Sequence, residues 1–155
     1  MVKYTVEQVT QLRTLRTGDQ IGVQCEEKCI PYIHFGIYLG AKQGVAEFGQ
    51  YLPRIVDLLE FKGKSNLVRA VYPQDVCLNP EEVVRRARDV VGKRVPWDAY
   101  SLITNNCEHF ATYCKTGKAF SLQVLNNMLL GKIVFGSIDV ALQNSTSKGS
   151  SSFSK

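Results

Sequence analysis

At residues 104–114 the chain reads Thr104-Asn105-Asn106-Cys107-Glu108-His109-Phe110-Ala111-Thr112-Tyr113-Cys114, where polar residues that can cap a helix lead directly into a cysteine. The residues three, four and seven positions after that cysteine are apolar or small, which predicts a helix packed on a sheet. A cysteine in a first helical turn faces backbone N–H groups and the positive end of the helix dipole, which favours the reactive thiolate. Cys107 is therefore a candidate nucleophile, and the same N–H groups are candidates to hold an oxyanion. The alternative is a buried structural cysteine.

A second stretch, far upstream, offers a base for this thiol. Pro31-Tyr32-Ile33-His34-Phe35-Gly36-Ile37-Tyr38-Leu39-Gly40 alternates and is rich in β-branched and aromatic residues, which predicts a strand ended by Gly40. Thiol acyl transfer needs a group that titrates near neutrality, and the chain contains 2 histidines. His109 lies roughly 200° round a helix from Cys107, so it points away. His34 is the candidate base, and a structural histidine is the alternative.

The strand that follows brings a carboxylate towards His34. Residues 41–44 predict a hairpin turn, after which residues 45–49 return as the next strand. Glu47 then lies near the His34 strand, where a carboxylate can hold the imidazole in one tautomer and stabilise its protonated form. Solvent exposure is the competing interpretation for Glu47.

Composition describes one globular domain with a basic surface. The chain has 155 residues, 45% of them hydrophobic, which is enough to bury a core without disulfides. The 19 Lys and Arg against 14 Asp and Glu leave a net charge of +5, which suits an anionic membrane surface, with a merely solvated surface as the alternative. No basic run interleaved with aromatic residues favours nucleic acid. The candidate membrane contacts are Lys42, Lys62, Lys64 and Arg69.

The cysteines indicate a reducing compartment and no cofactor. Their number, 5, is odd, their spacing is not that of a disulfide framework, and the first residues do not resemble a signal peptide, so the cytosol is expected. Cys25, Cys29 and His34 form only a weak zinc pattern, because no second pair of ligands matches them. No metal or other cofactor is predicted.

The remaining segments are less informative. Residues 1–17, with apolar residues at spacings of three, predict a short helix or an ordered arm, and further strands are predicted at 20–24, 53–59 and 66–72. Asn79-Pro80-Glu81-Glu82 predicts the start of a helix that ends at Gly92. The stretch from Leu122 to Leu142 is fairly apolar but interrupted by charges and glycines, so a packed or interfacial amphipathic segment is favoured over a membrane anchor.

Together these motifs resemble a known family. The two main boxes are His34-Phe35-Gly36-Ile37-Tyr38-Leu39-Gly40 and Asn106-Cys107-Glu108-His109-Phe110, with smaller matches at 15–19, 45–47, 91–93, 113–114 and Gly117. They resemble the lecithin:retinol acyltransferase-like proteins, which include the small phospholipase A/acyltransferases; certain picornaviral non-structural proteins also carry both boxes. On this basis the expected organisation is an arm at 1–11, a catalytic domain at 12–120, the amphipathic segment at 121–143 and a disordered tail at 144–155.

The resemblance implies an α+β, permuted papain-like fold, in which an antiparallel sheet supplies the histidine and a later helix, packed on it, supplies the cysteine. It implies a phospholipase A1/A2 and O-/N-acyltransferase in which Cys107 takes an acyl group from a glycerophospholipid as a thioester. Water, an amine, an alcohol or a lysophospholipid then accepts that group, with His34 as base and acid. The expected location is cytoplasmic, peripheral or C-terminally anchored at membranes.

One position departs from the family pattern. Relatives have a second histidine where this chain has Glu47, so the expected catalytic set is Cys107, His34 and Glu47. A catalytically inactive interaction or membrane-remodelling protein of the same fold is the main alternative. A thiol protease or deamidase that uses the same pair is a third.

Overall fold

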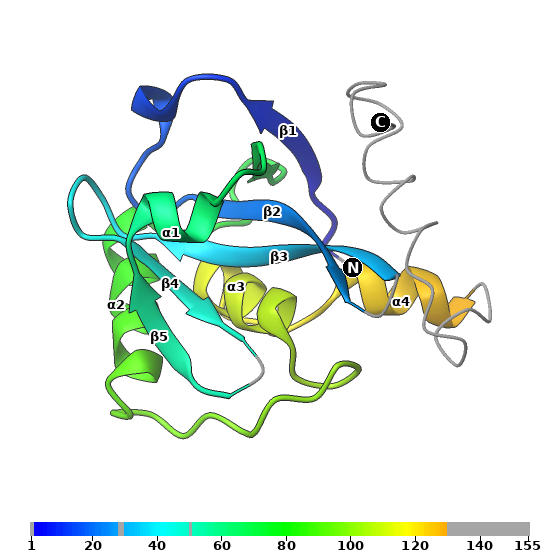
Figure 1. The fold of residues 1–155 in the computed structure, drawn as a ribbon. Coiled ribbons are helices and arrows are strands. Elements are labelled where there is room, and N and C mark those ends of the chain that lie inside the picture. The colour runs from blue at the N-terminus through cyan, green and yellow to red at the C-terminus, as the bar shows by residue number, and fades with distance from the viewer. Residues whose placement is uncertain (1, 28–29, 50, 130–155) are drawn as a thin grey trace.

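Six antiparallel strands form one open sheet in the computed structural model, which describes residues 2–27, 30–49 and 51–129 (Figure 1). Across the sheet the order is β1 (Thr5–Val9), β6 (Leu67–Val71), β2 (Gln20–Glu27), β3 (Ile30–Tyr38), β4 (Val45–Phe48) and β5 (Pro53–Val56). The predicted β3–β4 hairpin is confirmed: β4 pairs antiparallel with β3 after a turn that includes Gly40 and Gly44, both at positive φ. The strands and helices together confirm the predicted α+β class.

Helices cover both faces of this sheet. One face carries α2 (Pro80–Val91) and α3 (Cys107–Thr116), and the other carries α1 (Leu58–Lys62), while α4 (Leu122–Leu129) follows α3 and η1 (Leu12–Thr14) is a single 3-10 turn (Figure 1). The predicted apolar face of the cysteine helix is confirmed, because Phe110, Ala111 and Cys114 have 0% exposure in the core beneath the sheet. The predicted cap of α2 is also confirmed: Asn79 Oδ1 accepts the Glu82 N–H at 2.9 Å.

Of the two alternatives expected for residues 1–17, a short helix or an ordered arm, the helix is wrong for residues 5–9, which form β1. Val6 and Val9 are spaced by three, as on a helix, but successive side chains of a strand point to opposite faces. Val6 therefore packs into the core beside α2 and α3, and Val9 into the core beside α1. The apparent helical period comes from a strand that is buried on both faces.

The strand predicted at 53–59 is too long. β5 ends at Val56, and the next residues form α1, whose Phe61 is buried against the sheet. Asp57 precedes the helix with an extended backbone, which is the conformation of an N-cap residue.

The C-terminal expectations are only partly covered by the structure. Of the segment 121–143, residues 121–129 are described, and the tail at 144–155 lies outside the described residues. Over the ranges that the structure covers, no helix has the length and apolarity needed to cross a membrane.

Candidate active site

Asn106 places Cys107 at the first position of α3. The Asn106 side-chain oxygen accepts the N–H groups of Glu108 at 2.9 Å and His109 at 3.1 Å, and the Asn106 N–H donates to Nδ1 of His109 at 3.1 Å. This reciprocal arrangement is a capping box, with histidine in the role that Glu or Gln usually takes. His109 therefore serves the helix end rather than the thiol, and burial lowers the pKa of His109.

The cap corrects one expectation about the oxyanion. The sequence suggested that the first-turn N–H groups of the cysteine helix are open, but Asn106 already occupies those of Glu108 and His109. Among the residues that the structure describes, the Cys107 N–H is the first-turn amide with no acceptor. Only this backbone donor is left to face a developing negative charge beside the thiol.

His34 and Cys107 meet at an open edge of β3. Ile33 packs towards α3, while the next residue, His34, faces α1, where its ring centroid lies 5.5 Å from that of Phe61. The recorded β3–β4 pairing begins at Gly36, so the edge beside Ile33 is not covered by β4. Cys107 Sγ approaches this edge, 3.9 Å from the Ile33 carbonyl oxygen, and Cys107 lies close enough to His34 to help raise the pKa of its imidazole. Two residues predicted from separate motifs are thus in contact.

Glu47 is buried beside His34, so the solvent-exposed interpretation of Glu47 is wrong. It stands opposite Gly36 in the β3–β4 register, which makes it a diagonal neighbour of His34 on the same face. Its Oε1 lies 3.1 Å from His34 Nε2, and its side chain is 9% exposed. Since Nε2 is engaged by Glu47, Nδ1 is the ring nitrogen left for the thiol.

Arg54 completes the chain of charged groups, and sequence reasoning missed it. Arg54 stands directly opposite Glu47 in the β4–β5 pairing and donates from Nε to Glu47 Oε2 at 2.8 Å. The signal in the sequence was weak: a basic residue in the strand that follows the Glu47 strand. Only the register identifies it as the partner of the carboxylate.

Gly36 leaves room for this arrangement. A Cβ atom at Gly36 would lie 2.8 Å from the Ala46 carbonyl oxygen and 3.0 Å from the Phe61 ring. The missing side chain therefore lets Phe61 pack down beside His34. The glycine in the His34 strand motif has a steric role rather than a turn role, because its φ is not positive.

The electrostatics of the site favour a charged imidazole. Burial of the ring disfavours the charged form of His34 and acts to lower its pKa. The interactions of the ring with Cys107 and Glu47 outweigh this effect and raise the pKa of His34 to about 10. Burial also acts to raise the pKa of Glu47, yet the hydrogen bonds and charges of His34 and Arg54 lower it overall. The arrangement therefore favours a proton on His34 beside an ionised Glu47.

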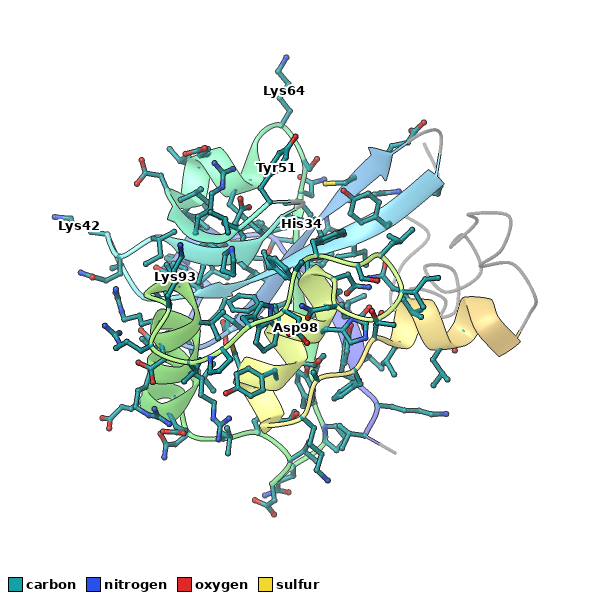
Figure 2. The ribbon with its side chains drawn as sticks, turned by 90° about the horizontal axis from the view of Figure 1, so that it is seen from below. His34, Lys42, Tyr51, Lys64, Lys93 and Asp98 are labelled. Carbon is teal, nitrogen blue, oxygen red and sulfur yellow. The ribbon has the colours of Figure 1, made fainter. Side chains whose placement is uncertain are left out.

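Figure 2 views the molecule from below, with His34 near the middle and Tyr51 and Asp98 labelled around it. Tyr51 belongs to the β4–β5 turn, and Asp98 lies in the loop that leads to α3. In the described ranges no three His, Cys, Asp or Glu side chains are arranged to hold a metal ion, and Cys29 of the weak zinc pattern lies outside those ranges.

Comparison with known proteins identifies the family. The model of the lecithin retinol acyltransferase family matches residues 13–120, which include His34, Glu47 and Cys107. The chain belongs to the lecithin retinol acyltransferase family. Its relatives are named as acyltransferases and phospholipases, so a family function in acyl-transfer chemistry is supported at this coarse level.

Three relatives show the extent of the similarity. Rat (Rattus norvegicus) lecithin retinol acyltransferase is 51% identical over 124 residues, covering 59% of this chain and 52% of the relative. The human (Homo sapiens) protein of the same name is 48% identical over 50 residues, covering 32% and 20%. Human phospholipase A and acyltransferase 1 is 44% identical over 59 residues, covering 38% and 32%. In these matches the family member described here spans from a fifth to about half of the relatives' length.

Proposed function

We propose that this chain is a thiol-dependent phospholipase A and acyltransferase that forms a thioester on Cys107. The observation that supports the proposal most strongly is that Cys107, at the first position of a helix, lies against the backbone of Ile33 beside His34, whose ring is paired with Glu47. A nucleophile, a base and a group that orients the base are the parts that covalent acyl transfer requires. The names of the family relatives support a lipid ester as the acyl donor.

In the acylation step, His34 takes the proton of the Cys107 thiol on Nδ1, while Glu47 stabilises the resulting imidazolium. The thiolate attacks the ester carbonyl carbon of a glycerophospholipid, and the oxyanion is held by the Cys107 N–H. When this intermediate collapses, the carbon–oxygen bond breaks. His34 then gives its proton to the departing lysophospholipid alkoxide, which leaves an acyl thioester on Cys107.

In the deacylation step, His34 acts first as a base towards the acceptor and then returns a proton to Cys107. A water, alcohol, amine or lysophospholipid approaches the thioester, and His34 removes its proton as it attacks the carbonyl carbon. The carbon–sulfur bond breaks, and the thiolate takes the proton back from His34. Water as acceptor gives phospholipase activity, of the A1 or A2 type, and the other acceptors give O- or N-acyl transfer.

Two exposed apolar tips flank the site and support a membrane substrate; we name them the apolar rim. One is Tyr51 and Leu52, 86% and 59% exposed, in the turn between the strands that carry Glu47 and Arg54. The other is Leu102 and Ile103, 56% and 45% exposed, on the loop before α3. That loop is tied to the cysteine helix, because Asn106 Nδ2 donates to the Leu102 carbonyl oxygen at 2.8 Å. Such tips suit insertion among lipid head groups.

The basic residues divide into two kinds. Lys42 and Lys64 project into solvent in Figure 2, where they are available to an anionic surface. Arg69 is instead committed to ion pairs with Glu7 at 2.8 Å and Asp19 at 3.2 Å, which argues against its expected role as a membrane contact. We therefore propose a peripheral, cytoplasmic enzyme that meets the bilayer through the apolar rim.

The rim can be tested by sedimentation with phosphatidylserine-containing vesicles. Replacing Leu102 and Ile103 together by Ser should lower the bound fraction several-fold. Leu59→Ser is the matched control, because Leu59 is 70% exposed but lies on α1, away from the loop before α3 (Figure 1). Equal binding of the natural chain, the double variant and Leu59→Ser would exclude Leu102 and Ile103 as membrane contacts.

The order of elements fits a permuted papain-like arrangement, in which the histidine strand precedes the cysteine helix along the chain. We include this topology in the proposal because it puts the nucleophile at a helix N-terminus against an antiparallel sheet.

Intact-mass measurement after brief exposure to dispersed phosphatidylcholine tests the enzyme proposal directly. An added acyl mass on the natural chain, absent from Cys107→Ala, is expected, with little or no adduct on His34→Ala. If no adduct forms and no lysophospholipid accumulates at long times, the chain is an inactive member of the family, and an interaction role becomes the better hypothesis. Acylation of Cys107 by a peptide but not by lipid would point to protease or deamidase chemistry.

A further inference from the structure

Glu108, the second residue of α3, is a completely buried carboxyl group that the proposed reaction does not use. Its two oxygens accept hydrogen bonds from the Tyr4 hydroxyl at 2.5 Å, the Ser121 hydroxyl at 2.7 Å, the Leu122 N–H at 2.7 Å, and the Gln123 side-chain and backbone N–H groups at 2.9 and 3.3 Å. A buried carboxyl group is costly unless its oxygens are hydrogen-bonded, so the loss of any of these donors would leave Glu108 incompletely paired in the core. The start of α4 is thereby tied to the second residue of the cysteine helix.

Gln123 carries this connection to the open edge of β3. Its Oε1 accepts the Ile33 N–H at 2.9 Å, and its Nε2 donates to the Ile33 carbonyl oxygen at 3.2 Å as well as to Glu108. The amide therefore pairs with both backbone groups of Ile33, as a neighbouring strand would. Gln123 is 9% exposed, so water does not compete freely for these bonds.

The two ends of this connection adjoin the two reactive groups. Glu108 follows Cys107 in α3, and Ile33 precedes His34 in β3. Cys107 Sγ also lies 3.9 Å from the same Ile33 carbonyl oxygen that Gln123 binds. Without the connection, the helix and the strand edge would be held together mainly by apolar packing, which resists sliding less well than directed hydrogen bonds.

We propose that Glu108 and Gln123 are positioning residues that clamp the cysteine helix to the histidine strand and so hold Cys107 in contact with His34. The catalytic consequence rests on the proposed acyl-transfer function, but the clamp itself does not. A displacement of about 1 Å between reacting groups can cost on the order of 100-fold in rate. The clamp therefore acts on the thiol–imidazole contact rather than on lipid binding.

Gln123→Leu is the sharpest variant, because leucine keeps much of the volume and removes both bonds to Ile33. The measurement is the rate of Cys107 alkylation by iodoacetamide across pH in the full chain, followed on the Cys107 peptide by mass spectrometry. We expect at least a tenfold slower reaction at neutral pH and a pH profile that approaches that of His34→Ala. With phospholipid, kcat should fall at least tenfold while KM stays within about twofold.

A stability control separates positioning from general weakening. Asn79→Ala removes the N-cap of α2, which lies outside the site, and should lower Tm without changing the alkylation profile. Alkylation of Gln123→Leu at the natural rate, or an equal slowing in Asn79→Ala, would overturn the clamp. Because iodoacetamide needs no lipid, this result stands even if the acyl adduct of the proposed function never appears.

The natural protein offers a second measurement if Gln123→Leu does not fold. Amide hydrogen exchange at Ile33 should be slow, although Ile33 lies on a strand edge that β4 leaves uncovered, because its N–H is held by Gln123. Exchange as fast as that of an open-edge amide would show that the clamp is not formed.

Discussion

The Nε2 atom of His34 lies 3.1 Å from Oε1 of Glu47, whose other oxygen accepts a hydrogen bond from Arg54. A carboxylate in this position orients the imidazole and favours its protonated form. We expect Glu47 to orient His34 in the proposed reaction. The predictions below test the consequences of that arrangement.

Replacing Glu47 by Gln should lower the pKa of His34, because the nearby negative charge that favours the imidazolium is removed. Leaving-group protonation needs a charged His34, so the alkaline limb of the acylation rate should move towards neutral pH by about one pH unit, with kcat/KM reduced on the order of tenfold. A pH–rate profile measures both. Glu47→His should restore much of the rate, whereas an unchanged alkaline limb in Glu47→Gln would contradict the role assigned to Glu47.

Arg54→Gln should also lower kcat/KM, but by less than Glu47→Gln. The guanidinium helps to lower the pKa of Glu47, but its side chain is 62% exposed and therefore strongly screened. We expect about a two- to threefold loss of kcat/KM at low salt that shrinks as ionic strength rises. A loss as large as that of Glu47→Gln, or one independent of salt, would mean that Arg54 acts through something other than this ion pair.

His34 should also make stability depend on pH. Its pKa is raised from 6.5 to about 10 in the folded chain, so its contribution is fully present below pH 6.5 and is lost as pH rises through about 10. Urea unfolding of the natural chain and of His34→Gln should therefore differ by about 1–3 kcal/mol at the acid end of this window, and the difference should diminish towards its alkaline end. If the difference in the free energy of unfolding between the two proteins grew with pH, the predicted direction of the pH dependence would be wrong.

Gly36→Ala should destabilise the protein, because the new Cβ would lie 2.8 Å from the Ala46 carbonyl oxygen. It should also displace Phe61 from His34, because the same Cβ would lie 3.0 Å from the Phe61 ring. The expected cost is about 1–3 kcal/mol, together with reduced thiol reactivity. Gly49→Ala is the matched control in the neighbouring strand region, since an added Cβ there has nothing within 4 Å. Chemical denaturation and iodoacetamide kinetics compare the two, and equal behaviour would show that the close packing at Gly36 has no consequence.

Asn106→Ala, at the cysteine helix, and Asn79→Ala, at α2, form a second pair of variant and matched control. Each removes a side-chain cap from a helix N-terminus and should cost about 1 kcal/mol. Only Asn106→Ala should also slow acylation, by tenfold or more, since it frees the first turn of the cysteine helix and the loop at Leu102. Similar acylation rates for the two variants at similar stability would argue that the α3 cap does not position the thiol.

Local sequence patterns were sufficient for several elements of this protein. The cysteine helix follows from its Asn106 cap, its apolar spacing and Gly117, which ends it in a left-handed conformation. The alternating His34 strand and the hairpin after it follow from β-branched residues and positive-φ glycines. These features depend on contacts within a few residues, and such contacts can be inferred from the order of side chains alone.

The tertiary structure decided which distant groups meet. The spacing of Val6 and Val9 resembled one face of a helix, but in the sheet the two side chains pack into the cores on opposite faces. Arg54 became the partner of Glu47 through strand register, and Gln123 reached Ile33 because α4 is docked against α3 by Glu108. Register and helix docking are set by packing over the whole core. The order of residues was therefore enough to suggest a candidate nucleophile and a candidate base, whereas the folded chain determined which groups hold them in place.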